Sequence, residues 1–424
     1  MLDLKLIREQ PDRVRQALAA RKAAFDLDAL LEKDSTCRRL MQELEKLRHD
    51  KRVASDEVGR LKGQGGSVEA KLVELKKVSE SENRLTGQVT ELEAEIQKSM
   101  YLIPNVPHDS VPVGGAQANK VVRSWGEPRQ FSFAPRTHLE LAESLKLVDL
   151  TRAAKISGSH FIFFTGVGAY LERALINFML DLHTTKHGYL EMSPPYLVNR
   201  ATMTGTGQLP KFEEDMYRLK EEDLFLIPTA EVPITNFHAG EILEPGVLPR
   251  YYAAYTACFR REAGSYGKET KGMTRVHQFD KVELVKFVPP ENSYEELEKL
   301  TADAEEILQL LELPYRVMAL AAGDLGFSSA KTYDLEAWSP GTQSWLEVSS
   351  CSNFEDFQAR RANIRYRDPA TKKARYLHTL NGSGVALART FIALLECHQN
   401  QDGSVTVPKA LRPYLDGLER LTPS

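Results

Sequence analysis

The first hundred residues carry apolar or small side chains at every third or fourth position, the spacing of a helical coiled coil. One run consists of Cys37, Leu40, Leu44, Leu47, Ala54, Val58 and Leu61, and Lys51 fills its single polar position. A glycine-rich break at 62–67 separates it from a second run of Val68, Leu72, Leu75, Val78, Leu85, Val89, Leu92 and Ile96, which Ser79 and Glu82 blur in the middle. The pattern predicts an antiparallel hairpin of two helices, each of roughly 30 residues and about 45 Å long.

The rest of the chain shows a mixed pattern after a stretch at 103–126 that is rich in proline and glycine and reads as a linker. Helical periodicity predicts helices over 171–183, 293–313 and 384–398, and shorter apolar runs predict strands over 251–262, 276–287, 332–338 and 344–351. Helices and strands do not alternate as βαβ units, and neither a Gly-x-Gly-x-x-Gly nor a Walker loop is present. We therefore expect an α+β protein with a helical domain at 1–102 and an antiparallel sheet flanked by helices at 103–424.

The strand predicted over 251–262 has two unlike faces. Its odd positions are mostly aromatic or apolar, whereas its even positions are mostly small and end in Arg260 and Glu262. We expect the odd face to pack on the core and the even face to form the floor of a pocket.

Composition restricts the class of protein. The chain has 424 residues, is 42% hydrophobic and carries a net charge of −4, so it is a globular protein without a uniformly basic surface. The charge is uneven, because residues 33–77 hold 12 basic and 8 acidic side chains. On charge alone, this segment is either the solvated face of a spacer or dimerising coiled coil, or a surface for nucleic acid.

Compartment and cysteine chemistry are constrained as well. No apolar run approaches the ~18 residues of a membrane helix, and the leading Met-Leu-Asp-Leu-Lys lacks the apolar core of a signal peptide. We expect a cytoplasmic protein that does not enter a membrane. The four cysteines are far apart, which disfavours a disulfide framework and a cysteine-rich zinc site.

Candidate chemistry is concentrated between Cys258 and Glu283. Phe279, Lys281 and Glu283 share a face of the second predicted strand, where an aromatic ring could stack on a base and a carboxylate could bind an ammonium about 13 Å away. The connecting loop contains glycines and cations that suit phosphate, namely Gly264, Gly267, Lys268, Lys271, Gly272 and Arg275. The alternative is an ordinary hairpin with a solvated basic loop.

This stretch resembles motif 2 of the class II aminoacyl-tRNA synthetases, specifically of the bacterial type of seryl-tRNA synthetase. Further segments are similar to the same family, including 104–107, 203–212, 229–233, 323–327 and 347–353, with motif 1 at 187–195 and motif 3 at 380–389. The resemblance covers nearly the whole chain. It implies ATP-dependent activation of L-serine to seryl-adenylate and transfer to the 3′ end of serine tRNA, and it leaves open whether selenocysteine tRNA is also a substrate.

The resemblance also implies roles for individual residues. Arg260 would bind the α-phosphate of ATP as a planar, bidentate cation, and Arg389 would meet the γ-phosphate. Phe279 would stack on the adenine. The remaining ATP-binding positions are Arg261, Glu262, Arg275, Val276, Glu347, Val348, Ser349 and Ser350, and Glu262 joins Arg260 and Arg389 as a catalytic candidate.

Metal and serine subsites follow in the same way. Glu347 and Ser350 would hold Mg²⁺, a hard cation suited to oxygen ligands, although strict strand alternation puts them on opposite faces unless the strand bulges or ends there. Thr229, Ala230 and Glu231 would form the serine-binding loop, Glu283 would bind the substrate ammonium, and Ser383 would contact serine. Gly382 and Gly384 are expected to allow close ligand approach before the motif 3 helix.

The family further implies a homodimer formed through motif 1, which ends at Pro195, and a tRNA grip by arm residues 33–77 together with the catalytic cleft. Two rivals remain. A paralogue that loads a carrier protein would lack the arm, and a non-catalytic RNA-binding relative would not need Arg260, Glu283, Glu347 and Arg389.

Overall fold

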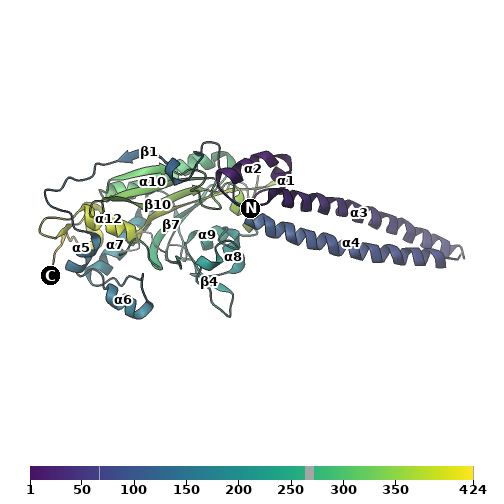
Figure 1. Cartoon of the computed structure of the whole chain (residues 1–424), viewed down its shortest axis with the longest axis horizontal. Coiled ribbons are helices and arrows are strands. Elements are labelled where there is room, and N and C mark those ends of the chain that lie inside the picture. The colour runs from purple at the N-terminus through teal and green to yellow at the C-terminus, as the bar shows by residue number, and fades with distance from the viewer. Residues whose placement is uncertain (66, 263–271, 424) are drawn as a thin grey trace. The chain divides into compact units, whose positions relative to one another are not determined.

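The computed structural model describes residues 1–65, 67–262 and 272–423. The chain separates into two compact units (Figure 1). The smaller unit contains Leu2–Leu18 and Ala23–Ile103, and the larger contains Met1, Ala19–Lys22 and Pro104–Ser424. Among the described residues, no helix combines the length and apolar character needed to cross a bilayer.

The smaller unit is dominated by two long helices, α3 (Leu27–Gly63) and α4 (Glu69–Leu102), which form the predicted antiparallel hairpin (Figure 1). The short helices α1 (Leu4–Glu9) and α2 (Pro11–Ala20) precede them. Asp26 caps the start of α3 by accepting a hydrogen bond from the amide of Ala29 at 2.9 Å. Most of the predicted seam is buried or half-buried; Leu72 is the exception, at 44% exposed.

Two of the three polar interruptions of the seam, Lys51 and Glu82, meet each other. Lys51 on α3 donates to Glu82 on α4, with 2.7 Å between Nζ and Oε2, and Arg48 reaches the other carboxylate oxygen at 3.2 Å. The Lys51 hydrogen bond is the main reason that the pKa of Glu82 lies below its usual range. One cross-helix ion pair therefore accounts for Lys51 and Glu82 in the hydrophobic pattern and helps to set the register of the hairpin.

The larger unit is built on an eight-stranded sheet with the order β1-β8-β9-β10-β13-β7-β6-β2. All neighbours are antiparallel except β2 and β6, which confirms the predicted antiparallel α+β body. The strands are β1 (Lys120–Trp125), β2 (Leu190–Glu191), β6 (Arg250–Phe259), β7 (Gln278–Val288), β8 (Tyr315–Ala319), β9 (Lys331–Ser339), β10 (Ser344–Asn353) and β13 (His378–Ala386).

Three helices cover one face of this sheet: α7 (Val167–Thr185), α10 (Ser293–Leu310) and α12 (Leu387–Cys397). Their apolar faces join the large core with Val282 and Leu284 of β7. Figure 1 shows α10, α12 and α7 close to β7 and β10. The opposite face of β7 packs in part on a smaller core that includes α11 (Phe357–Ala362), and α9 (Glu231–Asn236) lies beside it.

Shorter elements complete the body. The helices are α5 (His138–Ser144), α6 (Leu150–Ser157) and α8 (Arg200–Gly205), with 3-10 turns at Ala116–Ala118, Glu213–Asp215, Pro290–Asn292 and Lys409–Leu415. The minor strands are β3 (Leu197–Asn199), β4 (Leu224–Leu226), β5 (Ile242–Leu243), β11 (Arg365–Arg367), β12 (Ala374–Tyr376), β14 (Val405–Thr406) and β15 (Arg420–Leu421).

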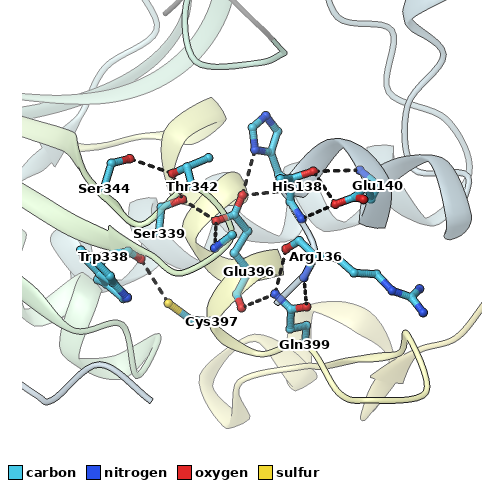
Figure 2. Close-up of polar contacts among 12 residues, drawn as sticks. Arg136, His138, Glu140, Trp338, Ser339, Thr342, Ser344, Glu396, Cys397 and Gln399 are labelled. Atoms are coloured by element: carbon cyan, nitrogen blue, oxygen red, sulfur yellow. Dashed lines mark hydrogen bonds and ion pairs between the residues drawn. The ribbon is translucent and has the colours of Figure 1, made fainter. Parts of the chain in front are cut away.

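A buried carboxylate fastens α12 to its surroundings (Figure 2). Glu396 is fully buried and accepts hydrogen bonds from the backbone and ring of His138 on α5, at 2.8 and 2.9 Å. Its second oxygen accepts from the Ser339 hydroxyl of β9 and from the Gly341 amide. These bonds fix the helix that carries Arg389.

The structure corrects the expected faces of β6. Ala253 lies in the large core, with Tyr251 and Tyr255 packed against it, as predicted for the odd face. The even face is also covered, because Tyr252 and Ala254 belong to the smaller core and Thr256 and Cys258 are fully buried. An interior strand is enclosed on both sides, so the pocket begins only after its last residue.

Several predicted boundaries also shift. The strand expected over 251–262 ends at Phe259, and the next starts at Gln278 rather than at residue 276. The helix expected from residue 384 begins at Leu387, because 384–386 are the end of β13, a strand that the pattern did not predict. Its glycines hide the alternation that marks a strand.

Candidate active site

A cavity of about 680 Å³ lies over the face of β7 that carries Phe279 and Lys281. Residues from β7, β10, β13, α9 and α12, together with several connecting segments, line it. Most of the predicted site residues are among them: Thr229, Glu231, Arg260, Glu262, Arg275, Val276, Phe279, Glu347, Val348, Ser349, Ser350, Ser383 and Arg389.

At one end of the cavity, Arg260 lies over the ring of Phe279. The guanidinium carbon is 5.1 Å from the ring centroid, a cation–π contact. The backbone amide of Arg260 donates to the carbonyl of His277 at 2.9 Å, which extends the β6–β7 pairing by one residue. The side chain is therefore held at the mouth of the hairpin.

Two more predicted residues pair beside it. Arg275 Nη1 lies 3.1 Å from Glu262 Oε2, so the two sides of the hairpin are linked by an ion pair. Gly272 belongs to the described part of the chain, whereas the loop residues Gly264, Gly267, Lys268 and Lys271 lie outside it.

A bulge in β10 resolves the alternation problem at Glu347 and Ser350. Glu347 pairs with Glu336 of β9, but Ser349 pairs with Leu335 and Ser350 with Asp334, so Val348 is the extra residue. Since Glu336 and Asp334 are two apart, Glu347 and Ser350 lie on one face. Ser349 points elsewhere and donates to the carbonyl of Ser383 at 2.7 Å.

The oxygen atoms at this bulge suit a magnesium ion. Glu347 supplies a half-exposed carboxylate and Ser350 a hydroxyl, a pair that leaves room for water and phosphate oxygens. Asp334 lies beneath them, and its Oδ1 is buried without a hydrogen-bond partner among the described residues. Burial and the neighbouring charge of Glu347 raise the pKa of Asp334 well above its usual range, a repulsion that a cation here would relieve. The described residues hold no cluster of three or more metal-binding side chains, so these two ligands do not form a complete protein cage.

Arg389 faces the same region from α12. Its guanidinium donates to the Glu347 carbonyl at 2.8 Å and to the Thr274 carbonyl at 3.3 Å, and lies 3.5 Å from the Glu347 carboxylate. The cation thus bridges β10 and the segment that leads into β7.

Next to the cavity, Glu283 is buried in a polar cluster. Its carboxylate forms an ion pair with Lys281 and accepts from Thr229 at 3.1 Å and from Asn381 at 2.9 Å. Lys281 also donates to Thr229 at 2.9 Å, and Ser383 lies directly opposite Glu283 across the β7–β13 pairing. Glu283 itself is not among the cavity-lining residues, whereas Lys281 is.

Glu231 stands beside this cluster and is almost fully buried. Burial, together with the charge of Glu283, raises its pKa to about 7, and a hydrogen bond from Gln358 opposes that shift. Thr229 accepts from the Glu231 amide at 3.2 Å, which shapes the turn into α9.

The two motif 3 glycines serve packing rather than ligand approach, contrary to our expectation. A Cβ on Gly382 would lie 2.9 Å from the sulfur of Cys351, and one on Gly384 would lie 2.6 Å from Nε2 of His183. Both contacts are on the core side of β13, so the glycines let this strand lie close to its neighbours.

Besides Glu283, three predicted residues are not part of the cavity wall. Arg261 is exposed and Ala230 is fully buried. Pro195 is exposed and lies beside exposed apolar side chains, including Leu197 at 41% and Leu190 at 62%.

Sequence reasoning placed Lys281 on the correct face but gave it no role, and it missed Asn381 and Gln358. The segments 203–212 and 323–327 resembled the family but were assigned no function. Both contribute to the cavity wall, through Thr206, Gly207, Gln208, Phe212, Gly326 and Phe327. The polar residues of these segments were a usable signal, but their contacts depend on distant parts of the chain.

Comparison with known proteins is consistent across the chain. Residues 1–107 match the family model described as the seryl-tRNA synthetase N-terminal domain, and 211–398 match the class II tRNA synthetase core domain (G, H, P, S and T). The chain is 56% identical to a serine–tRNA ligase of Desulfitobacterium hafniense and 53% identical to one of Carboxydothermus hydrogenoformans, covering 99% of each chain. It also resembles the crystal structure of seryl-tRNA synthetase from Pyrococcus horikoshii complexed with ATP, with a TM-score of 0.94, 40% identity and full coverage of both chains.

Proposed function

The chain belongs to the seryl-tRNA synthetases, which attach serine to tRNA at the expense of ATP, and we propose that both chemical steps take place in the cavity between Arg260 and Glu283. A carboxylate oxygen of serine attacks the α-phosphorus of ATP, and the bond to the β-phosphate breaks to release pyrophosphate. The terminal ribose hydroxyl of tRNA then attacks the acyl carbon, and AMP leaves.

Charge placement carries this proposal. Arg260, Arg275 and Arg389 line the cavity, and so does Glu231, which adjoins the polar cluster of Glu283 and senses the charge of Arg260. Positioning and electrostatic stabilisation dominate phosphoryl-type transfer, so fixed cations around the phosphates supply most of what the first step requires. Arg260 would neutralise the α-phosphate and Arg389 the γ-phosphate, and Phe279 would stack on adenine.

Glu347 and Ser350 would hold Mg²⁺ together with phosphate oxygens. A bound Mg²⁺ would supply charge neutralisation on the triphosphate. The contribution of the chain is the bulge at Val348, which turns both ligands to one face.

For serine, we propose that Glu283 binds the ammonium and that Glu231 accepts the hydroxyl. Ser383 and Thr229 would complete this subsite, and Ala230 would hold the loop backbone. A subsite with buried groups that need a hydroxyl partner rejects alanine strongly, because alanine would leave them unpaired.

The charge of the arm supports tRNA binding by 33–77. Six of its twelve cations form ion pairs within the hairpin. The other six are exposed and have no recorded ion pair in the described part of the chain: Lys46, Arg52, Arg60, Lys62, Lys76 and Lys77. Contacts from such cations to phosphates would make binding depend on salt. We propose that 1–102 acts as the tRNA-binding domain and 103–424 as the catalytic domain, in the cytoplasm.

Assembly as a homodimer is supported by the motif 1 surface. Exposed apolar side chains gather around Pro195 near the free edge of the sheet at β2, including Leu190, Tyr196 and Leu197. An apolar surface beside an unpaired strand edge suits a second copy of the same chain.

The decisive experiment is amino-acid-dependent exchange of pyrophosphate into ATP with each of the twenty amino acids, followed by charging of bulk tRNA. We expect exchange with serine far above that with any other amino acid, and charging of serine tRNA. Activation without charging would favour a carrier-loading paralogue, and neither activity would favour a non-catalytic RNA-binding protein. Purified selenocysteine tRNA, added as a separate acceptor, tests whether the protein also charges that tRNA.

A further inference from the structure

We propose that Gln358 is a positioning residue for serine recognition, because its side-chain amide holds the Glu231 carboxylate in the orientation that accepts the substrate hydroxyl. This inference rests on the proposed role of Glu231 in serine binding. It adds a residue from α11, a helix that none of the catalytic motifs includes.

The first observation is a direct and short contact. Gln358 is fully buried, and its Nε2 donates to Glu231 Oε1 at 2.6 Å. The same nitrogen lies 3.3 Å from the carbonyl of Thr206, a residue that lines the cavity. An amide in this position acts on the carboxylate without touching the cavity itself.

The second observation is that the amide cannot turn over freely. Thr379 on β13 donates its hydroxyl hydrogen to Gln358 Oε1 at 2.7 Å. A reversed amide would aim its NH₂ group at the Thr379 hydroxyl and its oxygen at the Glu231 carboxylate. The Glu231 carboxylate and the Thr206 carbonyl only accept hydrogen bonds, so they select the orientation in which the NH₂ group faces them. Thr379 holds the opposite end of the amide in that orientation, and it belongs to the strand that also presents Asn381 and Ser383.

The third observation concerns the free side of the carboxylate. Gln358 occupies Oε1, and in the described part of the chain no hydrogen bond is recorded to Oε2 of Glu231, a cavity-lining residue. One oxygen is anchored and the other can receive a substrate hydroxyl. Without the Gln358 hydrogen bond, the buried carboxylate of Glu231 can rotate or take up a proton. Either change removes the oxygen that would accept the substrate hydroxyl.

The charged groups around Glu231 explain why an anchor is needed. Glu283 disfavours the ionised form of Glu231, whereas Lys281 and Arg260 favour it, and the net effect with burial is a pKa of about 7. A hydrogen-bond donor stabilises the ionised form. Loss of the Gln358 donor should therefore shift the acid limb of the pH profile of kcat/KM for serine to higher pH.

The test compares Gln358→Met with wild type in serine-dependent pyrophosphate exchange from pH 6 to 8.5. Methionine keeps the length and apolar volume of the side chain but donates no hydrogen bond. We expect kcat/KM for serine to fall about 10- to 100-fold at pH 7, as for a lost hydrogen bond to a charged group. The KM for ATP should change less than about twofold. The acid limb should shift upward in pH.

Alanine provides the specificity readout, since it lacks only the hydroxyl. Its low exchange rate should change little in Gln358→Met, so the ratio of serine to alanine activity should collapse. Thr379→Val should show a smaller loss of the same kind, and Thr379→Ser, which restores the hydroxyl, should recover wild-type discrimination. Thr379→Val also serves as the second test if Gln358→Met fails to fold.

The inference is overturned if Gln358→Met and Thr379→Val lose activity on serine and alanine equally and keep the wild-type pH profile. That result would show that Gln358 only supports packing. Absence of serine-dependent exchange in the wild-type protein would instead refute the proposed function, so the two failures are distinguishable.

Discussion

The ammonium of Lys281 forms an ion pair with the carboxylate of Glu283, the group that we expect to bind the ammonium of serine. Both side chains are buried, and Thr229 and Asn381 complete the coordination of the carboxylate. Serine must therefore share Glu283 with an internal cation or displace it. The cation of Lys281 offsets the cost of burying the negative charge that we expect to attract the ammonium of serine.

Replacement of Glu283 by glutamine should weaken serine binding far more than ATP binding. The substitution keeps the shape but removes the counter-charge, and it also leaves Lys281 without its partner. We expect the KM for serine in pyrophosphate exchange to rise about 10- to 100-fold, while that for ATP changes little. Equal losses for both substrates would contradict the assignment of Glu283 to serine.

Replacement of Arg260 by alanine should nearly abolish adenylate formation. The guanidinium lies over the ring of Phe279, and water cannot replace its charge in a transition state that carries extra negative charge. A loss of about 10²- to 10³-fold in serine-dependent pyrophosphate exchange is expected. Arg250→Ala is the matched control, because this arginine at the start of β6 is exposed and lies off the cavity wall. Similar losses in both variants would argue against a special role for Arg260.

The bulge at Val348 predicts opposite behaviour for two adjacent serines. Ser350→Ala should raise the Mg²⁺ concentration needed for half-maximal exchange several-fold, because it removes one proposed ligand. Ser349→Ala should leave that concentration unchanged, since its hydroxyl bonds to the Ser383 carbonyl. Mn²⁺ binding followed by electron paramagnetic resonance in the presence of ATP gives an independent readout. An unchanged Mg²⁺ requirement in Ser350→Ala would remove Ser350 from the metal site.

Removal of residues 35–95 should separate the two activities. Lys33 Nζ lies 2.7 Å from Glu95 Oε2, so the two cut ends are adjacent and a short glycine linker can join them. Serine-dependent pyrophosphate exchange should persist, whereas charging of serine tRNA should be lost. A milder variant that reverses Lys62, Lys76 and Lys77 to glutamate should raise the KM for tRNA and reduce its salt dependence. Undiminished charging by the deletion variant would refute the role of the arm.

The neighbouring carboxyl groups of Glu172 on α7 and Asp280 on β7 predict how the stability of the protein depends on pH. Burial and the adjacent Asp280 raise the pKa of Glu172 to about 9, and Tyr255 donates to Asp280 at 3.0 Å. Because the native state then binds more protons than the unfolded chain, the free energy of unfolding should fall as pH rises from about 4.5 towards 9. Glu172→Gln should flatten this decline in urea titrations at pH 5, 7 and 9. Glu143→Gln, at an exposed position on α5, should follow the wild-type curve.

Much of the fold could be predicted because its signals are local. Heptad spacing identified the hairpin, and apolar runs identified β6, β7, β9 and β10 within a few residues. The strand β13 escaped because Gly382 and Gly384 carry no side chain to reveal alternation. Its packing against Cys351 and His183, which requires those glycines, is a contact with other segments.

Patterns along the chain were therefore enough to predict the division into a coiled-coil arm and an antiparallel body, together with the charged residues that we propose for the reaction. Local spacing encodes such features, since periodicity fixes which side chains share a face. Only the tertiary structure decided that Lys281 pairs with Glu283, that a bulge turns Glu347 and Ser350 to one side, and that Gln358 anchors a carboxylate 127 residues away. Strand register and helix docking set those contacts, and both depend on burial across the whole core rather than on neighbours along the chain.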